Sequence, residues 1–307
     1  MRSYTKLVAA ATLFLIYAGA MVTSTGSGLA VPDWPLSYGM LMPPMVGGIF
    51  YEHGHRMVAA TVGLLTLIQA FWLQKRAPRP FVRKLGWIAL AAVIVQGLLG
   101  GLTVIFLLPK TISISHAALA EIFFCITISI AFFSSRFYEG LSSRKESGTA
   151  DARVATRALV AIVFVQILLG AWMRHLGAGL AIPDFPLAFG RLVPQLDSIE
   201  IVSNFLHRVG AIAVVVVALI AGGKIRKAGE PLLLRFWWGL IALIGVQITL
   251  GAFTIWSEKE PIVTSFHVMT GAATLALTLI LALTAGSLAR SGGPVVRESY
   301  EQAEATA

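Results

Sequence analysis

The chain of 307 residues contains a single cysteine, Cys125, which lies inside an apolar run. One cysteine excludes a disulfide framework within the chain, a Cys-x-x-Cys-His heme attachment motif and a thiolate metal cluster. A lone cysteine in such surroundings usually behaves as a small apolar side chain. Any metal or redox chemistry must therefore depend on other residues.

Charge is also scarce, since 13% of the residues are charged, against about 25% in a typical soluble domain. Apolar runs of about 20 residues recur, each long enough to cross a hydrocarbon core of roughly 30 Å. Because these runs lack strand alternation, they predict membrane helices and not a barrel. The expected fold is all-α, a polytopic membrane protein with eight transmembrane helices near residues 5–23, 52–74, 82–107, 112–134, 153–174, 200–222, 232–256 and 261–288.

Lysine and arginine are absent from the first long loop, residues 24–51, whereas they occur in the loops that follow the second, fourth and sixth predicted spans. The positive-inside rule then places both termini in the cytoplasm, in a multi-pass protein of the cell inner (plasma) membrane. Topology accounts for the net charge of +9, so no nucleic-acid partner is expected. Residues 290–307 are predicted to form a polar cytoplasmic tail.

The two halves of the sequence repeat each other. Residues 28–39 match residues 179–190, and residues 96–100 match residues 247–251, each 151 residues further on. An even number of spans per half gives both halves the same orientation. The predicted architecture is two tandem pseudo-symmetric four-helix bundles, residues 1–135 and 153–289, joined by a cytoplasmic linker at 136–152.

Four histidines open four predicted spans on the same, outer side: His55, His116, His207 and His267. A single histidine at such a place is usually a hydrogen-bonded interfacial residue, but four at repeat-related positions favour ligands. Imidazole binds heme iron, and helix bundles build cofactor sites from facing side chains. Two histidines per bundle suit bis-imidazole ligation, or one shared site with an exchangeable ligand. They leave zinc or copper short of its usual ligand set.

Ionisable groups beside these histidines differ between the halves. Arg56 and Arg208 follow His55 and His207, and we predict that they bind heme propionates; the alternative is an arginine reaching the lipid headgroups.

Glu52 lies three residues before His55, on the same helix face. It can take up a proton or stabilise positive charge, whereas Asn204 occupies the equivalent position. The alternative is a first-turn glutamate favoured by the helix dipole.

Other polar residues have no assigned chemistry. His53 and His175 lack a histidine partner in the repeat, which indicates interfacial residues and not ligands. Glu121 lies five residues after His116, so it is expected to pair with a polar neighbour or to belong to a proton path. In the outer loops, Asp33 and Asp184 are expected to bind nearby backbone amides.

These residues resemble the heme A synthase family over nearly the whole chain: eight spans, two halves, four span-mouth histidines, Glu-x-x-His-Arg in the first half and x-x-His-Arg in the second. The resemblance implies that heme O is converted to heme A for cytochrome oxidase by oxidation of a porphyrin methyl to a formyl group. Some bacterial members carry a cysteine pair in an outer loop, and this chain has none. A thiol–disulfide step at the outer face is therefore not expected here.

The resemblance also implies roles for individual residues. His55 and His116 would flank the substrate heme, His207 and His267 would ligate a heme b that relays electrons, and Glu52 would be catalytic. The implied partners are the lipid bilayer, an unidentified electron acceptor, and the heme O-producing enzyme, which would hand over the substrate. The heme sites would lie towards the outer face.

Two other functions fit parts of the pattern. A non-catalytic diheme electron carrier of cytochrome b type would also need the four histidines, but it has no need of a carboxylate in only one half. A transporter would suit the internal repeat. Its helices, however, would be expected to show broken segments at the membrane midplane, and none is apparent.

Overall fold

The computed structural model describes residues 1–142 and 149–289, and this part of the chain is helical, with no strand. Eight helices are long and apolar enough to cross a membrane, which confirms the predicted all-α polytopic fold. They are α1 (Arg2–Ser24), α2 (Gly47–Arg76), α3 (Pro80–Ile105), α4 (Lys110–Phe133), α6 (Ala150–His175), α7 (Ile199–Ala228), α8 (Pro231–Trp256) and α9 (Pro261–Leu288). The predicted polar tail lies outside the described residues.

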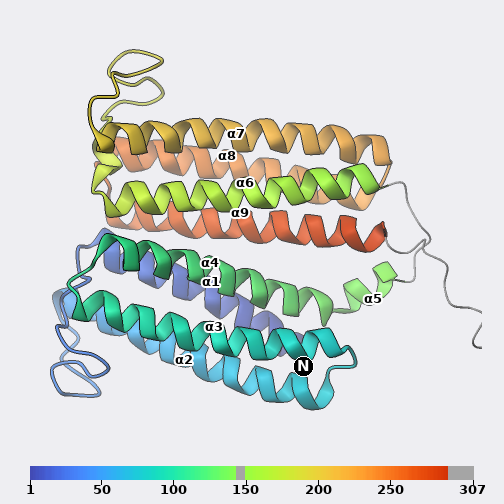
Figure 1. Cartoon of the computed structure of the whole chain (residues 1–307), viewed down its shortest axis with the longest axis horizontal. Coiled ribbons are helices and arrows are strands. Elements are labelled where there is room, and N and C mark those ends of the chain that lie inside the picture. Colours follow the sequence, from blue (N-terminus) through green and yellow to red (C-terminus); the bar gives the residue numbers. More distant parts are fainter. Residues whose placement is uncertain (143–148, 290–307) are drawn as a thin grey trace, which may run out of the picture.

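The helices of each half lie together, α1 to α4 in one group and α6 to α9 in the other (Figure 1). Helix α9 is central, because it packs against α1 and α4 of the first half as well as α6 and α8 of its own. Two short helices occupy the connections: α5 (Arg136–Ser142), within the predicted linker, and η1 (Ala178–Leu180), in the second outer loop. Leu141 of α5 is buried in the core of the second half.

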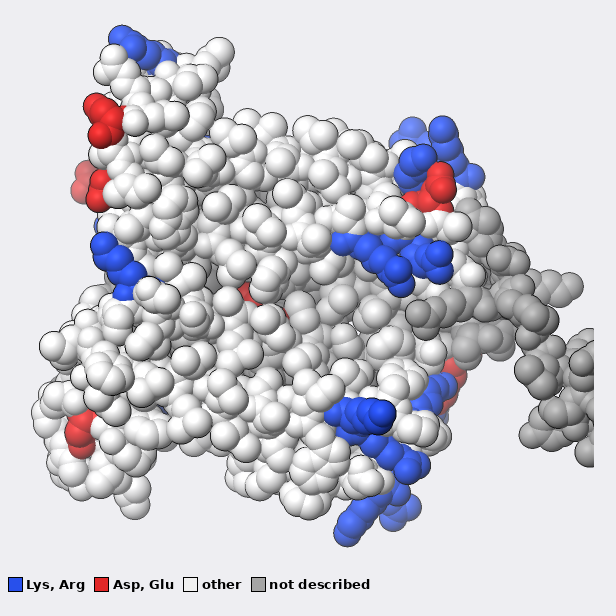
Figure 2. Space-filling model, in the orientation of Figure 1, with Lys and Arg blue, Asp and Glu red and all other residues white. Residues whose placement is uncertain are grey.

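The two ends of the helix layer differ in charge. On the face shown in Figure 2, Lys and Arg gather mainly at the end where α1 begins, and the opposite end carries few of them. Figure 1 shows that α1 starts and α9 finishes at this cationic end, whereas both long loops project from the opposite end. The alternation of loop charge along the sequence thus corresponds to a separation of charge in space.

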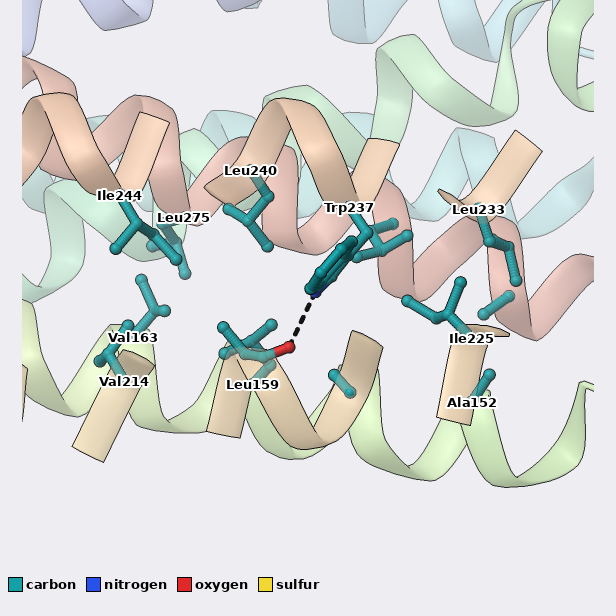
Figure 3. Close-up of a cluster of buried hydrophobic side chains, with 14 of the residues drawn as sticks. Ala152, Leu159, Val163, Val214, Ile225, Leu233, Trp237, Leu240, Ile244 and Leu275 are labelled. Carbon is teal, nitrogen blue, oxygen red and sulfur yellow. Dashed lines mark hydrogen bonds between the residues drawn. The ribbon is translucent and has the colours of Figure 1, made fainter. Parts of the chain in front are cut away.

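A contact in the core of the second half explains why a glycine lies inside α7 at position 222. Trp237 of α8 donates a hydrogen bond from its indole Nε1 to the Ala218 carbonyl of α7 at 2.8 Å (Figure 3). A Cβ at Gly222 would collide with this indole ring. The apolar run predicts a span that ends near residue 222, whereas α7 continues to Ala228. The glycine there makes room for Trp237 and does not end the helix.

The predicted start of α2 at residue 52 is also wrong, because the helix begins at Gly47. The sequence Pro-Pro-Met-Val-Gly-Gly before it looks like a loop. A Cβ at Gly48, however, would lie 2.8 Å from the Cβ of Ala30 in the outer loop. A close contact between helix and loop therefore requires the glycine, and Glu52 lies in the second turn of α2.

The two halves are joined near the loop-bearing end by a polar contact. Arg174 of α6 donates hydrogen bonds to the Ala20 carbonyl at 2.8 Å and to the Ser24 hydroxyl at 2.7 Å, both on α1. Ser265 of α9 donates to the same hydroxyl at 3.0 Å. This contact fixes α1 against α6 and α9 close to the region that carries the histidines.

Candidate functional site

Each of the four repeat-related histidines lies in the first turns of its helix, at the end that carries the long loops. His55 and His207 are eight residues beyond Gly47 and Ile199, the first residues of α2 and α7. His116 and His267 are six residues beyond the first residues of α4 and α9. The repeat seen in the sequence is therefore preserved in the helical positions of the candidate ligands.

Every one of these imidazoles packs against a glycine of the preceding long helix. A Cβ added at the glycine would lie 2.9 to 3.2 Å from the Cε1 atom of the ring, which is closer than an ordinary van der Waals contact. The pairs are Gly19 with His55, Gly100 with His116, Gly170 with His207 and Gly251 with His267. We did not single out these glycines from the sequence, although their spacing of 151 residues would have revealed them.

In the second half the two imidazoles face each other across a short gap. The ring centroids of His207 and His267 are 6.4 Å apart, and the ring planes are inclined by 76°. Two imidazoles on opposite sides of one metal have ring centres about 6 Å apart, given a metal–nitrogen bond of about 2 Å. The pair therefore fits an iron bound between two axial histidines.

The side chains around the histidines favour heme over a bare metal ion. Among residues 1–142 and 149–289, no group of three or more His, Cys, Asp or Glu side chains could hold a metal ion. A porphyrin supplies four nitrogen ligands of its own and needs only the two axial positions from the protein. In the first half, His55 and His116 lie close enough to interact electrostatically, and each has a buried Nδ1 atom with no partner in the described structure.

Glutamine side chains support three of the four histidines. Gln96 donates to the His116 carbonyl at 2.9 Å, with its Nε2 atom 3.4 Å from His116 Nε2. Gln166 donates to the His207 carbonyl at 2.8 Å and lies 3.1 Å from His207 Nδ1. These contacts fix both the helix turn and the imidazole that it carries.

The third glutamine, Gln247, supports His267 differently. Its Nε2 atom is 3.5 Å from His267 Nε2, and its backbone carbonyl is 3.2 Å from His267 Nδ1. The side-chain oxygens of Gln96, Gln166 and Gln247 are all buried without a partner in the described structure. Each is available to a group that enters beside the imidazoles.

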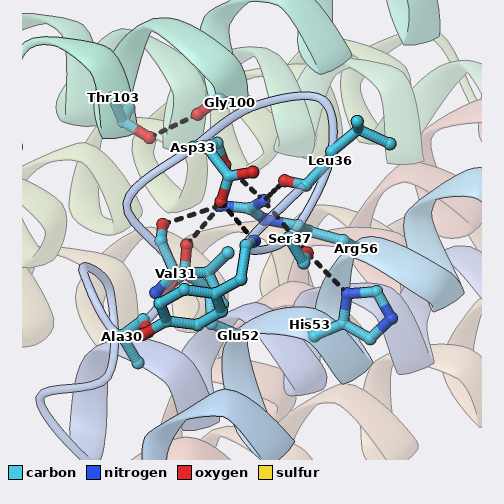
Figure 4. Close-up of polar contacts among 11 residues, drawn as sticks. Ala30, Val31, Asp33, Leu36, Ser37, Glu52, His53, Arg56, Gly100 and Thr103 are labelled. Atoms are coloured by element: carbon cyan, nitrogen blue, oxygen red, sulfur yellow. Dashed lines mark hydrogen bonds and ion pairs between the residues drawn. The ribbon is translucent and has the colours of Figure 1, made fainter. Parts of the chain in front are cut away.

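Glu52 is buried beneath the first outer loop (Figure 4). Its Oε2 atom accepts a hydrogen bond from the Val31 backbone N–H at 2.8 Å, and its Oε1 atom accepts one from Arg56 at 2.6 Å. Because α2 begins at Gly47, its first turn contains no acidic residue. The alternative of a first-turn glutamate is therefore wrong, and Glu52 instead connects helix, loop and arginine.

Arg56 and Arg208 hold the two outer loops. The Arg56 guanidinium donates to the carbonyls of Val31, Asp33 and Leu36 at 2.7 to 3.1 Å (Figure 4). Arg208 makes the equivalent set, to the carbonyls of Ile182, Asp184 and Leu187 at 2.8 to 2.9 Å. In the structure both guanidinium groups are thus used to order a loop, and their contact with a heme propionate stays a prediction.

The loop aspartates behave as predicted. Asp33 accepts hydrogen bonds from the backbone N–H groups of Tyr38 at 2.6 Å and Gly39 at 2.8 Å. Asp184 accepts the corresponding bonds from Phe189 and Gly190 at 2.7 and 2.8 Å. The bond from the glycine, followed by that from the aromatic residue, lowers the pKa of each aspartate below its ordinary value of 3.8.

The unassigned polar residues have separate positions. The Nδ1 atom of His53 lies 2.8 Å from the Ser37 hydroxyl, which ties α2 to the loop, and His175 lies near enough to His116 to interact with it electrostatically. Glu121 is buried, and its Oε2 atom has no hydrogen-bond partner in the described structure. For this atom the expected polar neighbour is therefore missing. Phe124, one turn further along the same helix face, packs against Ala272 between the halves.

A cavity of about 470 Å³ lies at the opposite, cationic end of the molecule, lined by residues that include Arg2, Arg76, Arg79 and Glu139. Arg2 pairs with Glu139 there at 2.7 Å. None of the four repeat-related histidines lines this cavity, so we do not assign it to the candidate site.

Comparison with known proteins gives one consistent result. A family model described as "Cytochrome oxidase assembly protein" (COX15-CtaA) matches residues 47–280, which include all four histidines. The Heme A synthase of Symbiobacterium thermophilum is 30% identical over 251 residues, covering 79% of this chain and 81% of that protein. The Heme A synthase of Anaplasma marginale strain Florida is 26% identical over 311 residues, covering 86% and 88% of the two chains. The chain therefore belongs to the heme A synthase family of cytochrome oxidase assembly proteins.

Proposed function

We propose that this protein oxidises one methyl group of heme O to a formyl group, giving heme A, with the substrate held between His55 and His116. Family membership supports the reaction, because the relatives are named Heme A synthase. The observation that carries the assignment to the first half is its buried carboxylate, Glu52, one helical turn from His55, where the second half has Asn204.

The second half is proposed to bind heme b between His207 and His267. The ring separation of 6.4 Å would let both imidazoles hold one iron. Gln166 contacts the His207 ring, and the Gln247 backbone carbonyl lies 3.2 Å from His267 Nδ1. Bound there, heme b would supply one-electron chemistry and so relay electrons away from the substrate half. The contact of Arg174 with α1 keeps the two halves at a fixed separation, which such a relay requires.

Glu52 is proposed to act on the substrate. Oxidation of the methyl group removes electrons and protons and builds positive charge at that carbon. A fixed carboxylate stabilises this charge and can take up a proton. Its two oxygens accept one hydrogen bond each, from Val31 and Arg56, so each keeps a lone pair for a proton. We propose water as the oxygen source, since the site lies at the loop-bearing end of the helices.

Arg56 and Arg208 are proposed to have two consecutive roles. Each orders the loop that covers its histidine, and each places a positive charge where heme propionates would lie. A guanidinium carries five N–H donors, and a carboxylate that approached it would replace backbone carbonyls as the acceptor. In each half, heme binding and the order of the outer loop would then depend on the same arginine side chain.

The proposed setting is the cell inner membrane, with the cationic end in the cytoplasm and the heme sites near the outer face. Heme O would be handed over by the enzyme that produces it, and an acceptor yet to be identified would take the electrons. The alternative function is a diheme cytochrome b-type carrier. It shares the four histidines but gives no reason for Glu52.

Extraction and mass analysis of the hemes bound to the purified protein separate these two functions. The enzyme should carry heme O or heme A together with heme b when it is made in cells that synthesise heme O. A protein that carries heme b alone and forms no heme A under those conditions would be a carrier, and the proposed reaction would be wrong.

A further inference from the structure

One of the four histidines lacks the glutamine that supports the others. Gln166 of α6 lies four residues before Gly170, the glycine against which His207 packs. The equivalent residue of α1, four before Gly19, is Leu15. The Nδ1 atom of His55 is buried and has no partner in the described structure, whereas His207 Nδ1 lies 3.1 Å from Gln166.

A second difference accompanies the first. The Gln166 side chain lies over Gly210 of α7, where an added Cβ would collide with the Gln166 Oε1 atom. The equivalent residue of α2, three after His55, is Val58. Leu15 and Val58 both pack against the same buried apolar cluster of the first half. A Gln–Gly pair in the second half is thus replaced by a Leu–Val pair in the first.

This replacement is confined to one histidine. His116, the other candidate ligand of the first half, keeps its glutamine, Gln96, as His267 keeps Gln247. The second half therefore has two supported imidazoles and the first half has one. This asymmetry is separate from that of Glu52 and Asn204, which concerns the loop side of the same helices.

We propose that the Leu15–Val58 pair makes His55 the releasable ligand, so that the first-half site exchanges its heme while the second-half site retains one. This inference rests on the proposed function, since a substrate heme must enter and its product must leave, whereas a relay heme must stay. Outer partners of a metal-binding histidine hold its ring in place, and their loss typically weakens metal binding about 10- to 100-fold. At His55 the pair Leu15 and Val58 withholds that support by filling the space with apolar side chains.

Reciprocal swaps test the proposal. L15Q/V58G gives the first half the second-half pair, and Q166L/G210V does the reverse. The full-length protein, purified with its hemes from cells that make heme O, is mixed with excess apomyoglobin, and the heme retained is extracted and separated by type over time. We expect L15Q/V58G to slow the loss of heme O and heme A about 10- to 100-fold, and Q166L/G210V to speed the loss of heme b by a similar factor.

Two further variants complete the design. Leu7 of α1 is 53% exposed, so Leu7→Gln adds a glutamine to the same helix away from any imidazole and should leave both release rates unchanged. Gln96→Leu removes the one glutamine support of the first half and should speed heme O loss further. If L15Q/V58G does not accumulate in membranes, Q166L/G210V and Gln96→Leu decide the matter.

The outcomes separate this inference from the proposed function. Unchanged release rates in both swaps would overturn the inference, even if the wild-type protein carries both heme types. A wild-type protein that forms no heme A in cells that make heme O would instead overturn the proposed function, whatever the swaps do to heme release.

Discussion

Arg56 donates a hydrogen bond to Glu52 at 2.6 Å, and Arg208 donates one to Asn204 at 2.9 Å in the same place of the second half. Each pair spans one turn of its helix and lies under its outer loop. The repeat thus keeps the structural role of this residue pair but changes its charge. Loop anchoring needs only an acceptor for the arginine, which Asn204 provides, so the carboxylate of Glu52 calls for a chemical reason.

We predict that Glu52→Gln slows the conversion of heme O about 10²- to 10³-fold, or stalls it at the alcohol, because a fixed charge near the reacting carbon is lost. The amide oxygen still accepts from Arg56, so the spans and the second-half heme should remain. Heme O, the hydroxymethyl intermediate and heme A are measured in cells that make the variant. Normal heme A would show that Glu52 only anchors the loop.

For the second half, we expect His207→Ala and His267→Ala each to remove the tightly bound heme b, because each takes away one of two axial ligands. The measurement is the low-spin heme absorption of the purified variants, together with the heme b content per protein. Unchanged absorption in both variants would contradict the ligand assignment and leave the 6.4 Å pair as a packing contact.

The orientation in the membrane is open to a direct test. Reporter fusions after residue 78, between α2 and α3, and after residue 185, in the second outer loop, should lie on opposite sides, the first in the cytoplasm. The physical basis is the gathering of Lys and Arg at one end of the helices. Reporters on the same side would contradict the eight-span topology.

The sequence predicted the number and type of long helices, because apolar runs of membrane length leave little choice of secondary structure in a bilayer. It also singled out the four histidines that lie together at the loop-bearing end, since the repeat distinguishes them from isolated polar residues; their role as ligands stays a prediction. Two helix limits differ from the predicted span limits, since α2 begins earlier, at Gly47, and α7 runs on to Ala228. Inside these helices Gly48 and Gly222 leave room for Ala30 and Trp237, and such contacts form only on folding.

Contacts between helices were beyond the sequence for the same reason. The roles of Arg56 and Arg208 in holding loop carbonyls, and of Gln96 in supporting His116, depend on which groups meet after folding. The repeat did mark Gln96 and Gln247 as equivalent. Only the packing shows that Leu15 occupies the place of a fourth glutamine.

The outer loops should respond to acid. The pKa of Asp33 and that of Asp184 are lowered by hydrogen bonds from the backbone amides, so these bonds stabilise the folded loop fully above the ordinary pKa of 3.8. That contribution is lost as the pH falls through the lowered folded value. Hydrogen exchange at the Tyr38 and Gly39 amides should therefore accelerate only below about pH 4, beyond the change expected from intrinsic exchange.

Asp33→Asn provides the control for that experiment. It keeps one acceptor oxygen but cannot titrate, so exchange at these two amides should be faster at neutral pH and should show no additional acid step. Loops that keep full protection well below the ordinary pKa in the wild-type protein and in this variant alike would show that the arginine contacts alone hold them.

The glycines beneath the imidazoles give the last prediction. A Cβ at Gly170 would lie 2.9 Å from His207 Cε1, and at Gly251 one would lie 3.1 Å from His267 Cε1, so Gly170→Ala and Gly251→Ala must displace the rings. A displaced axial ligand binds iron more weakly, and we expect heme b affinity to fall about tenfold or more.

Gly245→Ala is the matched control on α8, because its Cβ would meet nothing within 4 Å. Alanine also favours a helix over glycine by up to about 1 kcal/mol. If heme b content falls in Gly170→Ala and Gly251→Ala but not in Gly245→Ala, a weaker helix therefore cannot be the cause. Heme b titration of the apoprotein measures the effect; equal affinity in all three variants would show that the rings tolerate the displacement and that these glycines only allow close packing.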